Sequence, residues 1–190
     1  MDANIILALA AGKEKEPDQF RLASEIFEKI KDGEYLGVIS SLTLMEIMAV
    51  LRTQKGREQN NLKSLTSDKQ IEYVLNESKK MYDNLMGEVM RLPNIKFELG
   101  KPVDTRKILD ISFDIMQQSR GKVRFYDKCK KCGTKGITYS AFKGLGSDDM
   151  LHALIAKETG CDYLITFDSD FEELKNYEEI EPLEIMVLKW

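Results

Sequence analysis

Carboxylates stand at the ends of predicted strands, or on helices that begin there, along this 190-residue chain. They are, in chain order, Asp2, Glu46, Asp148, Asp149, Asp168 and Asp170. Because the carboxyl ends of parallel strands lie on one edge of a sheet, where ligands bind in α/β folds, we expect these acids to converge. Like charges that share a site raise one another's pKa values unless a cation binds them. Oxygen ligands select hard ions such as Mg²⁺ or Mn²⁺. Such ions activate water and stabilise charge on a phosphate, so the predicted chemistry is phosphodiester hydrolysis.

The chain has a single histidine, His152, which limits the metal sites and catalytic mechanisms it could have. A multi-histidine zinc site is excluded within one chain, and a Ser-His-Asp or Cys-His mechanism would have to use His152. This residue lies in a helical pattern among Leu and Ala, which is typical of a core or supporting histidine, so we assign it no catalytic role. With 32 Asp and Glu residues, the chain is rich in the side chains that carboxylate chemistry needs.

The stretch 144–171, which carries most of these acids, is predicted to fold as a helix, a tight turn and a strand. Ser147 is a good N-cap, and Gly160 suits the left-handed end of the helix. Asp148 and Asp149 then lie in the first turn, where the helix dipole alone would favour them. Adjacent helical residues point about 100° apart, so only one of the two faces an ion directly.

Helices and strands alternate along the rest of the chain. The predicted helices cover residues 18–31, 42–52, 67–92 and 102–118, and the predicted strands cover residues 35–39, 95–98, 163–166 and 183–188. The first residues are predicted to turn from a strand end into a helix, and Ser40 or Ser41 is predicted to cap the helix that carries Glu46. Alternation of this kind indicates an α/β fold, a three-layer α/β/α arrangement with a mostly parallel central sheet. Its length indicates a single domain over residues 1–190.

The net charge of −4 is unevenly distributed. Segment 120–143 contains eight Lys or Arg residues and one acid, a charge of +7, so the remainder of the chain carries −11. Its glycines and its lack of a helical period predict a long loop or an inserted hairpin. Four aromatic residues alternate with the basic ones: Phe125, Tyr126, Tyr139 and Phe142. The mixture suits phosphate neutralisation and base stacking on single-stranded RNA, and a solvated loop with a small apolar anchor is the alternative.

The same segment contains Cys129-Lys-Lys-Cys132, which is half of a zinc site. The chain offers no second pair of this kind, because its third cysteine, Cys161, lies in the turn after a predicted helix. A zinc ion shared between two copies, a disulfide and free thiols stay open, and free thiols are favoured.

The longest apolar run, Ile5–Ala11, is far shorter than the roughly 20 residues of a membrane helix. An acid and no basic residue precede it, unlike a secretory signal. We therefore expect a cytoplasmic protein without membrane association.

Four segments taken together resemble the PIN-domain metal-dependent ribonucleases, which include the VapC-type toxins of toxin–antitoxin pairs. The segments are Asp2-Ala-Asn4, Ser40-Ser-Leu-Thr-Leu-Met-Glu46, Asp149-Met-Leu-His-Ala-Leu-Ile-Ala156 and Leu164-Ile-Thr-Phe-Asp-Ser-Asp-Phe171. The metal-binding and catalytic acids that the resemblance implies are Asp2, Glu46, Asp149 and Asp168. Asn4 and Thr166 would be supporting polar residues, and Asp170 a fifth ligand or an acid near the metal.

The resemblance implies an Mg²⁺- or Mn²⁺-dependent endoribonuclease, acting as a toxin of a toxin–antitoxin pair or as an RNA-processing nuclease. It also implies a homodimer and an antitoxin-type protein partner. The alternative is a catalytically weak PIN-like module that binds RNA or supports assembly. The family has a full strand before its first acid, whereas only Met1 precedes Asp2 here, so we expect either a missing or very short first strand or a sheet that starts differently. Segment 120–143 stands as an insertion before the third acid.

Overall fold

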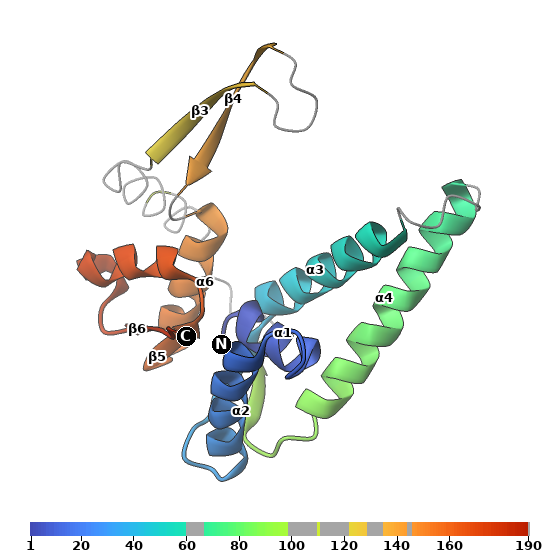
Figure 1. Ribbon diagram of the computed structural model, residues 1–190. Coiled ribbons are helices and arrows are strands. Elements are labelled where there is room, and N and C mark those ends of the chain that lie inside the picture. The colour runs from blue at the N-terminus through green and yellow to red at the C-terminus, as the bar shows by residue number, and fades with distance from the viewer. Residues whose placement is uncertain (60–66, 99–109, 111–121, 129–134, 144–145, 190) are drawn as a thin grey trace. The chain divides into compact units, whose positions relative to one another are not determined.

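The computed structural model describes residues 1–59, 67–98, 110, 122–128, 135–143 and 146–189 (Figure 1). The chain divides into two compact units. The first comprises Met1–Lys101, Leu164–Asp168 and Met186–Trp190, and the second comprises Pro102–Tyr163 and Ser169–Ile185. The predicted helix 102–118 and the pair Cys129 and Cys132 fall outside the described residues, Asp110 apart.

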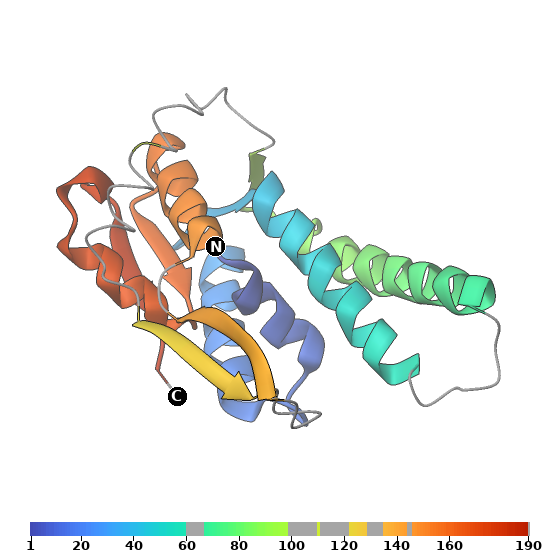
Figure 2. The ribbon, with the colours of Figure 1, turned by 90° about the horizontal axis from the view of Figure 1, so that it is seen from above.

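The first unit contains four helices among its described residues: α1 Ala3–Ala11, α2 Pro17–Lys31, α3 Ser41–Gln59 and α4 Ser67–Val89. Asp2 caps α1, and Gly12 ends it with a φ of 77°, a conformation that favours glycine. α2 begins at a proline, which suits the first helical position, and has lysines in its last turn, where they complement the helix dipole. The long helices α3 and α4 lie side by side (Figures 1 and 2).

Short parallel strands accompany these helices. β1 (Gly37–Ser40) pairs with β2 (Ile95–Glu98) in parallel. β5 (Tyr163–Thr166) pairs with β6 (Glu184–Val187). The amides of Glu184 and Leu188 donate to the carbonyls of Asp162 and Thr166, respectively, so the partners advance in the same direction along both strands.

The backbones of Met1 and Asp2 have hydrogen bonds to both β1 and β5. The nitrogen of Met1 donates to the carbonyl of Val38 at 2.9 Å, on the β1 side. The amide of Asp2 donates to the carbonyl of Ile165 at 3.1 Å, on the β5 side. Met1 and Asp2 thus contact β1 and β5 through one backbone hydrogen bond each, and the expectation of a missing or very short first strand stays a prediction.

The buried core of the first unit gathers apolar side chains from all four helices, β1 and the residue after β5. Its largest fully buried members include Ile5, Ile6, Ile30, Ile39, Ile47 and Leu51. In α1 and α2 the buried positions recur at the three- and four-residue spacing of an amphipathic helix. This core holds α1 and α3 together, and these two helices carry the first two predicted metal ligands.

The second unit contains the β3–β4 hairpin, α6 and two 3₁₀ helices. β3 (Lys122–Lys128) and β4 (Lys135–Lys143) pair antiparallel, so of the two predicted alternatives, a long loop or a hairpin, the described residues form the hairpin. α6 covers Ser147–Glu158, and Gly160 has a φ of 73° just beyond it, as predicted. The 3₁₀ helices are η1 (Ser169–Asn176) and η2 (Glu178–Ile180).

The predicted α/β class is confirmed by these helices and short parallel strands. Within the described residues each sheet has two strands. No helix in the described part of the chain has the length and apolarity needed to span a membrane.

We predict that Gly37→Val destabilises the protein by about 1–3 kcal/mol, the cost of overpacking a filled core. A Cβ atom at Gly37 would lie 3.1 Å from the Ile30 side chain and 3.2 Å from those of Ile95 and Met1. Urea unfolding measures the change. Gly56→Ala in α3 is the control, because its Cβ meets nothing within 4 Å and alanine favours helix. A Gly37→Val protein as stable as the parent would contradict the tight packing of β1.

Candidate metal centre

Asp2 is a buried carboxylate, 6% exposed, whose orientation is fixed by hydrogen bonds. Its Oδ1 accepts from the amide of Ala3 at 2.6 Å. Its Oδ2 accepts from Nδ2 of Asn4 at 2.7 Å and from the hydroxyl of Thr166 at 2.5 Å. Because burying a charge is costly unless it is hydrogen-bonded, these donors make a buried acid tolerable at this point of the chain.

Asn4 and Thr166 also tie Asp2 to the carboxyl end of β5. Nδ2 of Asn4 donates to Oγ1 of Thr166 at 2.9 Å, and Oδ1 of Asn4 accepts from the amide of Phe167 at 3.2 Å. The amide of Asp168 donates to Oγ1 of Thr166 at 3.0 Å. These contacts have the supporting character that the resemblance implies for Asn4 and Thr166.

Two hydroxyl groups at the junction of β1 and α3 hold the residue before Asp2. Oγ1 of Thr43 donates to the carbonyl of Met1 at 3.2 Å. Oγ of Ser40 accepts from the amide of Thr43 at 3.2 Å and lies 3.0 Å from its Oγ1. Ser40 therefore caps α3, and it is one of the two caps, Ser40 or Ser41, that the sequence predicted. No role was predicted for Thr43 from the sequence, although its hydroxyl group, three positions after the cap residue Ser40, was a signal that could have pointed to it.

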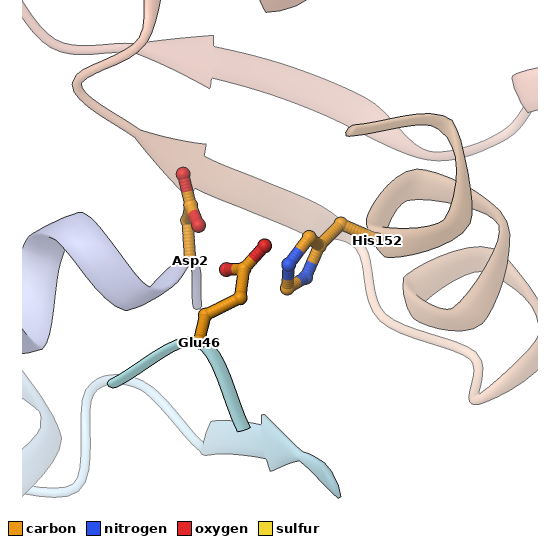
Figure 3. Close-up of side chains that lie close together, drawn as sticks. All are labelled: Asp2, Glu46 and His152. Atoms are coloured by element: carbon orange, nitrogen blue, oxygen red, sulfur yellow. The ribbon is translucent and has the colours of Figure 1, made fainter. Parts of the chain in front are cut away.

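Glu46 of α3 lies beside Asp2 (Figure 3). The two carboxylates offer oxygen atoms within 4.8 Å of one another. Glu46 is half-buried, whereas Ile47, the next residue of α3, is fully buried. His152, which Figure 3 also labels, belongs to the second unit, where it is buried on α6 with 4% of its surface exposed.

Asp168 belongs to the first unit and follows β5 by two residues. Its side chain is exposed, and its amide enters the network around Asp2 through Thr166. Asp170, in the second unit, is half-buried in the first turn of η1.

Asp149 has a structural role in the second unit. Its Oδ2 accepts from the amide of Gly146 at 2.7 Å, which caps the start of α6. Asp149 is half-buried, whereas Asp148 is exposed. The N-cap is thus Gly146 rather than Ser147, because Asp149 supplies the capping oxygen from within the first turn. Metal binding by Asp149, and by Asp170, stays a prediction.

The donors gathered in the first unit fit a hard divalent cation. They are oxygen atoms of two carboxylates, one held rigidly and the other on the half-exposed side of a helix. Mg²⁺ and Mn²⁺ prefer such ligands. Two unit charges about 4 Å apart repel by roughly 4 kcal/mol at the effective dielectric of a protein surface, and a cation between them turns that repulsion into attraction.

Comparisons of the chain with protein-family models, with curated proteins and with solved structures find no match. The likeness to the PIN-domain ribonucleases therefore rests on the four segments quoted from the sequence.

We predict that Thr166→Val destabilises the protein by about 1–3 kcal/mol, because it leaves buried hydrogen-bonding groups of Asp2 and Asn4 without the Thr166 hydroxyl. Urea unfolding is again the measurement. Thr53→Val is the matched control, since the Thr53 hydroxyl donates to the carbonyl of Ala49 on the exposed side of α3. Equal, small effects of the two substitutions would mean that the network around Asp2 contributes little to stability.

Proposed function

We propose that this protein is an Mg²⁺- or Mn²⁺-dependent endoribonuclease with Asp2 and Glu46 at the centre of its metal site. The observation that supports this most is the approach of their carboxylate oxygens to within 4.8 Å. The acids are 44 positions apart in the sequence, and Asp2 is buried and fixed by three donors. Asp149 and Asp168 are proposed as the further acids, and Asp170 as a ligand or an acid near the metal.

Asp2, Asn4, Glu46 and Thr166 each have a defined part in this proposal. A bound ion would stabilise the charge that develops on the phosphate and would activate water. Asn4 and Thr166 hold the Asp2 carboxylate in one orientation, so it loses no conformational freedom when it binds a cation. Glu46 is half-exposed on α3, and its side chain is accessible for relaying a proton.

The proposed reaction is hydrolysis of an RNA phosphodiester bond. The oxygen of water forms a bond to phosphorus, and the bond from phosphorus to the 3′ oxygen breaks. A carboxylate or a second water takes the proton that the attacking water loses, and the 3′ oxygen gains a proton. The products are a 3′-hydroxyl and a 5′-phosphate, the outcome expected of a metal-assisted in-line displacement.

The finer architecture is part of the same proposal. A three-layer α/β/α arrangement with a mostly parallel sheet is favoured by the place of Met1 and Asp2, which have hydrogen bonds to β1 on one side and to β5 on the other. A second copy of the chain and an antitoxin-type partner stay predictions of the resemblance.

A second candidate function is a catalytically weak module that binds RNA through its basic segment. The charge of +7 within residues 120–143 favours it. Metal dependence separates the two functions, because a binding module holds RNA without a divalent ion, whereas a nuclease needs the ion for turnover.

We predict that Asp2→Asn and Glu46→Gln each lower Mn²⁺-dependent cleavage of a single-stranded RNA by about 100-fold or more, since each removes a negatively charged ligand. Gel analysis of end-labelled RNA measures the rate, and cleavage by Asp149→Asn and Asp168→Asn tests the further acids. The control is Glu34→Gln, which changes net charge equally at an exposed position.

Mn²⁺ titration by calorimetry gives an independent reading of the same site. The parent protein should bind Mn²⁺, and the Glu46→Gln variant should bind it much more weakly while keeping the parent's circular dichroism spectrum. Undiminished cleavage by both Asp2→Asn and Glu46→Gln would refute the proposed site. RNA binding without Mn²⁺ binding or cleavage would favour the second candidate function.

A further inference from the structure

The register of the β3–β4 hairpin determines which of its residues share a face. Lys122 is opposite Lys143, and the next four pairs follow without a shift, ending at Tyr126 opposite Tyr139. A bulge then separates this ladder from the pair Lys128 and Lys135. Because opposite residues share a face and successive pairs alternate between faces, the five pairs can be assigned to two faces.

The two faces differ in chemistry. Positions 122, 124, 126, 139, 141 and 143 share one face, and positions 123, 125, 140 and 142 share the other. The sequence places Lys122, Arg124, Tyr126, Tyr139 and Lys143 on the first, together with one alanine. We call these five residues the basic–tyrosine face. The opposite face has one valine, two phenylalanines and one serine, and it has no charge. The ladder thus separates cations and phenols from apolar residues.

Cross-strand pairing adds a second observation. The register sets Lys122 opposite Lys143 at one end of the hairpin and Lys128 opposite Lys135 near the other. Like charges directly opposite in an antiparallel pair destabilise it, because their Cβ atoms are about 5 Å apart. An anion bound at such a pair removes the repulsion. The two pairs are six residues apart along β3, roughly 20 Å, so an extended polyanion suits them better than a single phosphate.

We propose that the basic–tyrosine face of the β3–β4 hairpin is a binding surface for single-stranded RNA. Lys122, Arg124 and Lys143 neutralise phosphates, and Tyr126 and Tyr139 provide rings on which bases stack. The inference rests on the proposed function for the choice of RNA as the polyanion. Its physical basis is the charge, since a +7 segment on a chain that otherwise carries −11 concentrates the attraction for a polyanion at the hairpin.

Single strands fit this face better than duplexes or membranes do. Stacking on tyrosine needs unstacked bases, which a duplex does not present. A membrane-surface site would need apolar residues among the cations to enter the acyl boundary, and the register places the phenylalanines on the opposite face.

The charge contribution is tested with the double variant Arg124→Gln/Lys143→Gln of the full chain. Its affinity for a fluorescent RNA of about 12 nucleotides is measured by anisotropy in EDTA, over a range of salt concentrations. At about 0.1 M salt the affinity should fall by about tenfold or more, and the slope of log K against log salt should fall by about 1.4. The control is Lys13→Gln/Lys15→Gln, which removes the same charge at exposed positions of the first unit and should leave the slope unchanged.

The stacking contribution is tested with Tyr126→Leu and Tyr139→Leu. Each should lower the affinity by about tenfold, because stacking of one base is lost, while the salt slope stays the same. Phe125→Leu and Phe142→Leu are the matched controls on the opposite face and should change the affinity by less than about twofold. Circular dichroism and a thermal melt show whether each variant remains folded. A Tyr→Ala pair at the same positions repeats the test if a leucine variant fails to fold.

The proposal is overturned if the Arg124→Gln/Lys143→Gln variant binds as the Lys13→Gln/Lys15→Gln control does. It is also overturned if the tyrosine and phenylalanine variants behave alike. Equal binding to duplex RNA, or to phosphatidylserine vesicles with the same residue dependence, would contradict it as well. Failure of this inference and failure of the proposed function can be told apart, because Asp2→Asn should strongly lower cleavage yet leave binding in EDTA unchanged. Normal binding by hairpin variants with intact metal-dependent cleavage would refute only the hairpin inference.

Discussion

The hydrogen bonds from Thr166 and Asn4 to the buried Asp2 carboxylate are the interaction on which the first unit depends. Thr166 lies 164 positions after Asp2 in the chain, so this short contact joins the first helix to the end of β5. A buried carboxylate without such donors would cost several kcal/mol, and the chain would have little reason to keep it on stability grounds alone. The network supplies hydrogen-bond donors to the buried carboxylate and holds it in one orientation beside Glu46. The proposed chemistry follows from that combination of burial, fixed orientation and a neighbouring acid.

Met1 and Asp2 connect β1 and β5 through their backbones. They have one backbone hydrogen bond on the β1 side and one on the β5 side. The Thr43 hydroxyl adds a bond to the Met1 carbonyl, and Ser40 in turn caps the helix on which Thr43 lies. The same helix carries Glu46, so the contacts that hold Met1 also set the distance between the two acids. Fold and candidate site are thus built from the same hydrogen bonds.

Most of the local structure in the described residues could be predicted from the sequence, because periodicity and capping signals are local. Ile95–Glu98 and Tyr163–Thr166 are strands with the predicted bounds, and Gly160 ends α6 in the expected conformation. α3 runs beyond the predicted end at residue 52 to Gln59, through a polar stretch that has no apolar period from which a helix could be predicted. Contacts between distant segments leave no local signature, so the approach of Glu46 to Asp2 was predicted only from the expected convergence of strand ends at one sheet edge and from the likeness to a family. The role of Thr43 was missed although its position after the cap was a local signal, because its bond to the Met1 carbonyl joins segments far apart in the sequence. The register of the hairpin was needed to assign its charged and apolar residues to separate faces, because composition alone does not give that assignment.

Anomalous diffraction from crystals of the protein grown with Mn²⁺ tests most directly whether Asp2 and Glu46 bind one divalent cation together. We predict an anomalous peak with carboxylate oxygens of both Asp2 and Glu46 at about 2.1 Å. A peak that lies away from these two carboxylates, or no peak at all at saturating Mn²⁺, would contradict it.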